Sequence, residues 1–212
     1  MSNLFLVLIK SATLLYMNKT VQSEARLIEW QLLAGGSALG LVSAFLQVIE
    51  RMRFADAPAE KLFCDINAVI NCNTVFQAWQ SSVFGFSNAI MILAIFAIIF
   101  GLSLAGLTGS KLNRGVRLTG QAVMLFFLGF GSWYMWQSTY VINALCIFCI
   151  FNYAAVIITN LAWLRINARD LPIPDEYRLR IVQLTNKKFD IIFWILWAAF
   201  VKIMILMHFL NR

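Results

Sequence analysis

The stretch NALCIFCIFNYAAVIITNLAWL, residues Asn143 to Leu164, decides the fold of this chain. It has no charged residue and is long enough to span a membrane, since roughly 20 apolar residues in a helix cross the ~30 Å hydrocarbon core of a bilayer. It also carries Cys146 and Cys149, two thiols about one helical turn apart. The stretch therefore predicts a transmembrane helix with a dithiol near one end, and the question is what that dithiol reacts with.

The rest of the chain has the composition of an integral membrane protein. Of its 212 residues, 61% are hydrophobic and only 13% are charged, which is far from the balance of a soluble domain. Hydropathy and length predict an all-α integral membrane protein with five transmembrane helices. They are expected at Ile28 to Ile49, Asn88 to Leu107, Leu118 to Ile142, Asn143 to Leu164 and Phe189 to Leu210. The apolar stretch Leu4 to Met17 carries Lys10 and is too short for a span.

The orientation in the membrane follows from the basic residues, because short segments rich in lysine and arginine stay in the cytoplasm. Twelve of the seventeen basic residues fall on one side of the predicted topology. They are Lys10, Lys19, Arg26, Lys111, Arg114, Arg117, Arg165, Arg169, Arg178, Arg180, Lys187 and Lys188. The net charge of +7 is explained by this topology, and no basic patch interleaved with aromatic residues points to nucleic acid.

The predicted organisation has four parts. Residues 1–27 form a cytoplasmic N-terminal segment, and residues 28–164 form a four-helix bundle whose long outer loop is 50–87. Residues 165–188 form a basic cytoplasmic connection to a fifth helix at 189–212. The chain is thus expected in the plasma (inner) membrane, with the outer loop on the extracytoplasmic side.

All four cysteines fall on that outer side, where disulfides persist. Cys64 and Cys72 lie in the outer loop, and this pair could be a structural disulfide or a mobile shuttle. The Cys146–Cys149 spacing on a helix start is typical of a reactive dithiol, although two buried cysteines can also act as small apolar residues. A tetrathiolate zinc site would place two ligands at the membrane boundary and is disfavoured, so no metal is predicted.

The start of the 143–164 helix should favour a thiolate. Asn143 is the expected N-cap, which would place Cys146 in the first turn, next to the unsatisfied N–H groups and the positive end of the helix dipole. The remaining interpretation of four outer cysteines is a relay of two dithiols. A quinone is a suitable acceptor, because it dissolves in the bilayer and takes the two electrons that a dithiol gives.

Three motifs resemble the vitamin K epoxide reductase family in its bacterial form, over roughly Trp30 to Leu164. They are CDINAVINCNTVFQAW from Cys64, VFGFSNAIMI from Val83 and CIFCIFNY from Cys146. The loop pair precedes the Cys-x-x-Cys pair, which distinguishes this family from the analogous DsbB oxidases. The resemblance implies a four-helix transmembrane bundle around a quinone pocket, here followed by a fifth transmembrane helix.

The resemblance also implies roles for individual residues. Cys149 would lie next to the quinone, Cys146 would exchange with the loop pair, and Cys64 or Cys72 would take electrons from a thioredoxin-fold (DsbA-like) protein. Asn88 and Tyr153 match the positions that hydrogen-bond the quinone oxygens, menaquinone or ubiquinone. From the residues alone, Asn88 could equally be an N-cap and Tyr153 a core tyrosine bonded to a neighbouring helix.

The chain departs from the family pattern at three places. Ala78 replaces a common serine or threonine, Ser87 replaces a common proline, and a fifth helix replaces the thioredoxin-like domain that many members carry. The partner is therefore expected to be a separate protein.

The predicted function is that of a membrane thiol:quinone oxidoreductase supporting disulfide formation in exported proteins. The alternatives are a quinone-epoxide reductase that uses the same cysteines, a non-enzymatic scaffold stapled by two static disulfides, and a multi-pass transporter. The transporter is the weakest of these, because the spans offer few polar residues for a substrate path.

Overall fold

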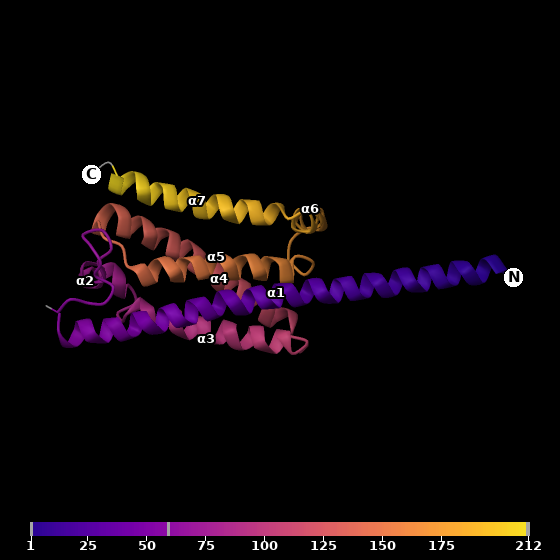
Figure 1. The fold of residues 1–212 in the computed structure, drawn as a ribbon, viewed down its shortest axis with the longest axis horizontal. Coiled ribbons are helices and arrows are strands. Elements are labelled where there is room, and N and C mark those ends of the chain that lie inside the picture. Colours follow the sequence, from indigo (N-terminus) through magenta and orange to yellow (C-terminus); the bar gives the residue numbers. More distant parts are fainter. Residues whose placement is uncertain (1, 59, 211–212) are drawn as a thin grey trace.

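The computed structural model describes residues 2–58 and 60–210, with side chains from residue 27 onward. The described residues form helices, and the longest connection between them is the outer loop between α1 and α2 (Figure 1). They are α1 (Ser2–Asp56), α2 (Cys72–Gln77), the 3₁₀ turn η1 (Trp79–Ser82), α3 (Asn88–Leu107), α4 (Arg114–Gln137), the π turn η2 (Ser138–Ile142), α5 (Ile147–Asn167), α6 (Asp175–Asn186) and α7 (Phe189–Leu210). The expected all-α membrane fold is confirmed, while the prediction for Leu4 to Met17 concerns side chains outside the described residues.

Four of the described helices are long and apolar enough to cross a membrane. They are residues Leu27–Asp56 of α1, Asn88–Leu107, Ile147–Asn167 and Phe189–Leu210. The fifth expected span corresponds to α4, which has 24 residues but begins with Arg114 and Arg117 and carries the buried Gln121. The helix is therefore where the sequence predicts it, with a more polar composition than the other four.

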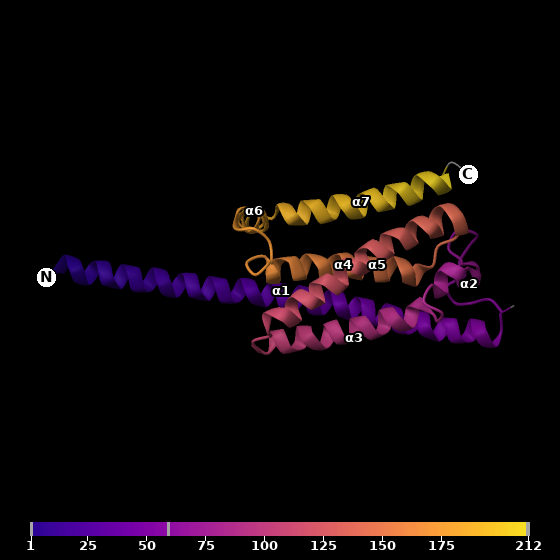
Figure 2. The same ribbon diagram turned by 180° about the vertical axis from the view of Figure 1, so that it is seen from behind.

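The bundle is built around α5, which has α1, α4 and α7 as neighbours, while α3 packs against α1 (Figure 2). Two glycines allow α1 to approach both partners closely. A Cβ on Gly36 would lie 2.7 Å from Ile158 of α5, and a Cβ on Gly40 would lie 2.4 Å from Phe96 of α3. These contacts explain the Gly-xxx-Gly spacing in α1 as close helix packing.

The helix α7 packs on the bundle through one face. Asp190, Trp194 and Val201 are buried, whereas Ile192, Ile195, Phe200 and Ile203 are exposed, as expected for a lipid-facing surface. At one end of the helix, Asp190 accepts two hydrogen bonds from Arg165 of α5. At the other end, His208 Nε2 lies 2.9 Å from Oδ1 of Asn143, the residue that follows the π turn. The fifth helix is thus a fixed part of the bundle.

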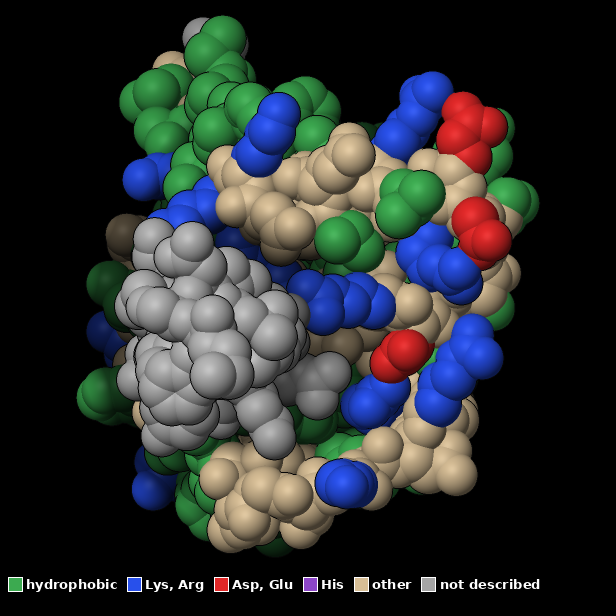
Figure 3. All heavy atoms as spheres, turned by 90° about the vertical axis from the view of Figure 1, so that its right-hand side faces the viewer, with side chains coloured by type: hydrophobic (Ala, Val, Ile, Leu, Met, Phe, Trp, Pro, Cys, Tyr) green, Lys and Arg blue, Asp and Glu red, His purple; other side chains and the backbone are tan. Residues whose placement is uncertain are grey.

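The two ends of the bundle differ in character. The outer loop and α2 lie at one end, and the α3–α4, α5–α6 and α6–α7 connections lie at the other (Figure 1). Lysine and arginine side chains gather over the described part of that second end (Figure 3). The charge asymmetry that the sequence predicts is therefore present in the folded chain.

Candidate functional site

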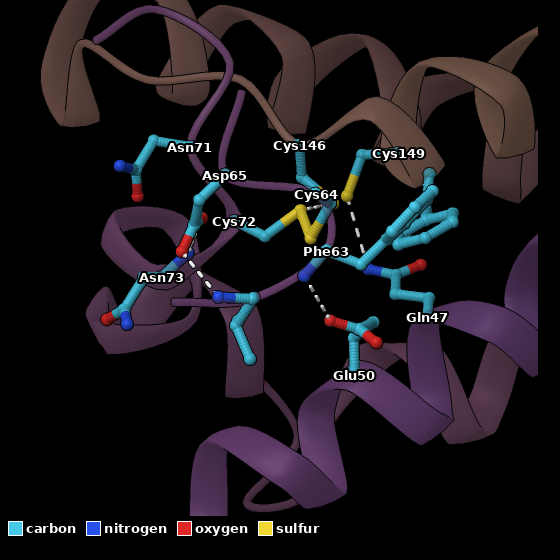
Figure 4. Close-up of a disulfide and its surroundings, with 12 residues drawn as sticks. Gln47, Glu50, Phe63, Cys64, Asp65, Asn71, Cys72, Asn73, Cys146 and Cys149 are labelled. Atoms are coloured by element: carbon cyan, nitrogen blue, oxygen red, sulfur yellow. Dashed lines mark hydrogen bonds between the residues drawn. A yellow bond between two sulfur atoms is a disulfide. The ribbon is translucent and has the colours of Figure 1, made fainter. Parts of the chain in front are cut away.

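The loop cysteines are joined to each other. Cys64 and Cys72 form a disulfide, and both are almost completely buried (Figure 4). Cys72 is the first residue of α2, whose N-cap Asn71 accepts a hydrogen bond from the backbone N–H of Thr74 at 2.8 Å. The short helix that contains Cys72 is thus begun by a regular side-chain cap.

Two carboxylates hold the loop around this disulfide. Asp65 accepts hydrogen bonds from the backbone N–H groups of Leu62 and Asn73, each at 3.0 Å. Glu50, near the end of α1, accepts one from the N–H of Phe63 at 3.0 Å. These bonds fix the backbone beside each loop cysteine, as Figure 4 shows.

A single pair of backbone hydrogen bonds joins the loop to the segment before α5. Leu145 donates to the carbonyl of Val69 at 2.7 Å and accepts from the N–H of Asn71 at 3.0 Å, forming an isolated parallel bridge between Ile70 and Leu145. The residues that follow on each side come together as a result. Cys72 Sγ and Cys146 Sγ lie 3.3 Å apart.

The start of α5 differs from the sequence prediction. Asn143 is not its N-cap, because it adopts a left-handed conformation with φ 60° at the end of η2. Asparagine tolerates this conformation better than most residues do. The helix begins at Ile147, and Cys146 itself occupies the N-cap position. The prediction that Cys146 lies in the first turn is wrong by one position, since residues 144–146 are used to meet the loop.

The N-cap position still favours the Cys146 thiolate. Burial alone would raise the pKa of this thiol, but interactions with the Cys149 thiol and with the backbone N–H groups of Cys149 and Phe148 outweigh burial, so the pKa is lowered from its ordinary value. The negative charge of Asp65 acts in the opposite direction. Cys146 is thus suited to nucleophilic exchange with the sulfur that faces it.

Cys149 lies in the first turn of α5. Its thiol and that of Cys146 are both free and buried. Gln47 of α1 donates a hydrogen bond from Nε2 to Cys149 Sγ at 3.2 Å, and its Oε1 accepts one from Asn152 Nδ2 at 2.8 Å. The sequence interpretation missed Gln47 and Asn152, although buried polar residues within apolar spans are a recognised sign of a functional site.

A narrow cavity of about 60 Å³ lies beside Cys149. The lining is mainly apolar and aromatic, with a few polar groups, and it includes the predicted Cys149, Asn88 and Tyr153 together with Gln47, Asn152, Phe127, Phe130 and Tyr134. Tyr134 belongs to the aromatic cluster GSWYMWQSTY near the end of α4 and forms part of the pocket wall.

The unpaired acceptor groups of the pocket fit a hydroquinone, the reduced form of a quinone. Asn88 is the first residue of α3 and does not cap it, because Ser87 occupies the N-cap position. The Asn88 side chain instead donates from Nδ2 to the carbonyl of Gln80 at 2.7 Å. The carbonyl oxygens of Asn88 and Asn152 are buried without a hydrogen-bond partner among the described residues. Buried acceptors of this kind are costly unless a donor reaches them. The two hydroxyls of a hydroquinone are such donors.

Tyr153 lines the pocket and is also bonded to neighbouring helices. Its hydroxyl lies 2.7 Å from Ser132 Oγ of α4 and accepts a hydrogen bond from Trp197 Nε1 of α7 at 2.9 Å. The interpretation of Tyr153 as a tyrosine bonded to neighbouring helices is therefore confirmed, while its hydrogen bond to a quinone stays a prediction. Gly131 makes room for the ring, since a Cβ there would lie 2.7 Å from Tyr153 Cδ2.

The four cysteines do not form a metal site in this arrangement. Cys64 and Cys72 are used by their disulfide. Among residues 27–58 and 60–210, whose side chains are described, no cluster of three or more His, Cys, Asp or Glu side chains could hold a metal ion. The Cys64–Cys72 pair instead lies next to the Cys146–Cys149 pair, and Cys149 reaches a mostly apolar pocket.

The comparisons with known proteins agree with this geometry. No curated protein matches the chain significantly. The family model described as the vitamin K epoxide reductase family matches residues 31–164, which include all four cysteines, Asn88 and Tyr153. This match covers more than half of the chain and ends before α6 and α7. The chain belongs to the vitamin K epoxide reductase family, whose members are membrane oxidoreductases linked to quinones of the vitamin K type.

Proposed function

We propose that the protein is a membrane thiol:quinone oxidoreductase. It passes electrons from a separate thioredoxin-fold protein through Cys64/Cys72 and Cys146/Cys149 to a membrane quinone, and so supports disulfide formation in exported proteins. The observation that carries this proposal is the 3.3 Å distance between Cys72 Sγ and Cys146 Sγ, together with the position of Cys149 in the pocket wall. One dithiol thus reaches the outer loop and the other reaches a site for a membrane-soluble acceptor.

The transfer between the pairs is a balanced thiol–disulfide exchange. The partner's dithiol reduces Cys64–Cys72 and is itself oxidised. The Cys72 thiolate then attacks Cys146 of an oxidised Cys146–Cys149 pair, forming a Cys72–Cys146 disulfide and releasing the Cys149 thiolate. Cys64 next attacks Cys72 and releases Cys146. The loop pair ends oxidised and the helix pair reduced, which is the state of the structure.

The helix pair then loses two electrons and two protons as it returns to its disulfide. A bound quinone accepts both and becomes a hydroquinone. Gln47 donates to Cys149 Sγ and stabilises its thiolate, while the carbonyl oxygens of Asn88 and Asn152 are available to the hydroxyl groups of the product. The mostly apolar lining limits the access of water to the reacting sulfur.

Cys64 is the better candidate for the cysteine that exchanges with the partner. Cys72 already faces Cys146, whereas Cys64 follows Phe63, whose side chain is 81% exposed on the outer loop. The basic character of the opposite end of the bundle favours an orientation with this loop on the extracytoplasmic side of the plasma (inner) membrane.

The test is thiol trapping of the purified, fully reduced protein after a soluble quinone is added. We expect quinone to oxidise Cys146 and Cys149 in wild type and in Cys64→Ala, and to leave the Cys149→Ala protein reduced. If quinone oxidises none of these proteins, the redox proposal is wrong and a static scaffold becomes the better account. Direct assay of an epoxide substrate separates this activity from quinone-epoxide reduction by the same cysteines.

A further inference from the structure

The fifth helix contributes one hydrogen bond to the wall of the pocket. Trp197 of α7 donates from Nε1 to the hydroxyl oxygen of Tyr153 at 2.9 Å. The family match ends at residue 164, so this donor comes from a part of the chain that the family model does not include. The question is what the contact does for Tyr153.

The direction of each hydrogen bond around the tyrosine follows from its neighbours. Ser132 donates its hydroxyl proton to the carbonyl of Leu128 at 2.6 Å, so Ser132 Oγ is an acceptor toward Tyr153. The Tyr153 hydroxyl therefore donates to Ser132 and accepts from Trp197. Without a ligand, the Tyr153 hydroxyl proton therefore points to Ser132 and not into the pocket.

The two contacts behave differently when Tyr153 donates to a ligand in the pocket. The bond to Ser132 must break, because the hydroxyl has only one proton. The bond from Trp197 can remain, since rotation about the C–O bond moves the proton and leaves the oxygen in place. A hydrogen bond received by the oxygen also polarises the O–H group and makes it a stronger donor.

The position of Trp197, on α7, is fixed relative to the bundle. The bonds between Arg165 and Asp190 and between His208 and Asn143 hold the two ends of α7, and Trp197 lies between them. The ring of Tyr153 has little freedom of its own, because it lies against the backbone of Gly131. The contacts of α7 thus fix the indole N–H of Trp197, and Gly131 fixes the ring that carries the phenol oxygen of Tyr153.

We propose that Trp197 is a positioning residue for the quinone site and that α7 is a working part of the oxidoreductase. It holds the Tyr153 oxygen in place while the hydroxyl proton turns from Ser132 to a quinone oxygen. This inference rests on the proposed function, because it assigns Tyr153 a donor role toward the quinone.

The test uses reduced full-length protein and a soluble short-chain quinone, with KM and kcat measured for thiol oxidation. Trp197→Phe keeps an aromatic ring and removes the N–H group. We expect its KM for the quinone to rise about fivefold with kcat nearly unchanged, which corresponds to the loss of one hydrogen bond. Tyr153→Phe should raise KM by at least as much, and adding Trp197→Phe to it should have no further effect.

Trp194→Phe is the matched control. Trp194 lies on the same face of α7 and is buried, and its Nε1 has no hydrogen-bond partner among the described residues. This variant should keep the wild-type KM. The proposal is overturned if Trp197→Phe behaves like wild type, or if it raises KM equally in the Tyr153→Phe background, which would indicate a general effect on packing.

A separate readout distinguishes this proposal from the proposed function. The indole proton of Trp197 should give a hydrogen-bonded NMR shift in wild type without any quinone, and Tyr153→Phe should move it. If that shift is present but quinone fails to oxidise the wild-type thiols, the proposed function is wrong, and the assigned role of Trp197 is wrong with it. If thiol oxidation proceeds and the shift does not respond to Tyr153→Phe, only the role of Trp197 is wrong.

Discussion

The two cysteine pairs are held in different ways. The loop pair is positioned through bonds to its main chain, which come from the carboxylates of Asp65 and Glu50 and from the bridge between Ile70 and Leu145. The helix pair is surrounded by side chains, with Gln47 on Cys149 and the pocket beyond it. The difference indicates that the loop contacts place the Cys72 sulfur, whereas the side chains around the helix pair set the reactivity of the Cys149 sulfur.

The largest expected effect concerns which loop sulfur meets the helix. In Cys64→Ala/Cys149→Ala, the remaining Cys72 and Cys146 should form a disulfide almost completely under mild oxidation, because a gap of 3.3 Å needs little movement to close. Peptide mapping by mass spectrometry without reductant measures this product.

The matched variant is Cys72→Ala/Cys149→Ala, which leaves Cys64 and Cys146. This protein should stay mostly reduced under the same conditions. Equal cross-linking in the two variants would show that the loop does not select Cys72, and the contrast between the pairs would then lose its basis.

The next effect concerns the reactivity of the helix pair. Gln47→Leu should slow oxidation of Cys146 and Cys149 by quinone about tenfold or more, since a hydrogen bond to a charged group contributes about 1.5–3 kcal/mol. Stopped-flow thiol trapping measures this rate. Gln121→Leu is the control, because Gln121 is also buried but bonds to Asn167 away from the cysteines. The role of Gln47 is wrong if both variants are slowed alike.

A smaller effect should be confined to the loop pair. Asp65→Asn leaves one acceptor oxygen where the carboxylate serves two backbone N–H groups. We expect dithiothreitol to reduce Cys64–Cys72 about fivefold faster, in line with the loss of one such bond. Oxidation of the helix pair by quinone should stay within about twofold of wild type.

Asp175→Asn on α6 is the control for this change, because its ion pair with Arg178 is exposed and lies outside the site. A slower quinone reaction in Asp65→Asn, with the loop disulfide unaffected, would reverse the assignment of Asp65 to the loop pair.

The smallest effect is on pH dependence. The lowered pKa of Cys146 keeps its thiolate populated to lower pH than in an ordinary cysteine, so the alkylation rate of Cys146 should fall only as pH drops through that lowered pKa. In Cys149→Ala the main interaction that lowers this pKa is lost, and the profile should move to higher pH. Iodoacetamide labelling across pH checks this, and an unchanged profile in Cys149→Ala would contradict it.

Much of the fold could be predicted from the sequence, because it depends on local signals. Apolar runs located the long helices α1, α3, α4, α5 and α7, although not the short α2 and α6, and the cysteine spacing located both dithiols. The family motifs pointed to Asn88 and Tyr153, which do line the pocket. Their roles toward a quinone stay predictions.

The parts that could not be predicted depend on contacts between distant segments. Nothing local marks Ile70 and Leu145 as bridge partners, and the bridge in turn moves the start of α5 to Ile147. Asn143 looked like an N-cap because the π turn η2, which ends α4, has no clear sequence signature. Trp197 looked like one of many aromatic residues in an apolar helix.

The bridge between Ile70 and Leu145 also limits how the chain can vary. Its hydrogen bonds use only main-chain atoms, so many side chains are compatible with those two positions. Chain length is not free in the same way, because one residue inserted between Ile70 and Cys72 would move the sulfur by about 3.3 Å along an extended chain. The site therefore tolerates substitution where it does not tolerate insertion, and loop redesign should preserve residue counts before residue types.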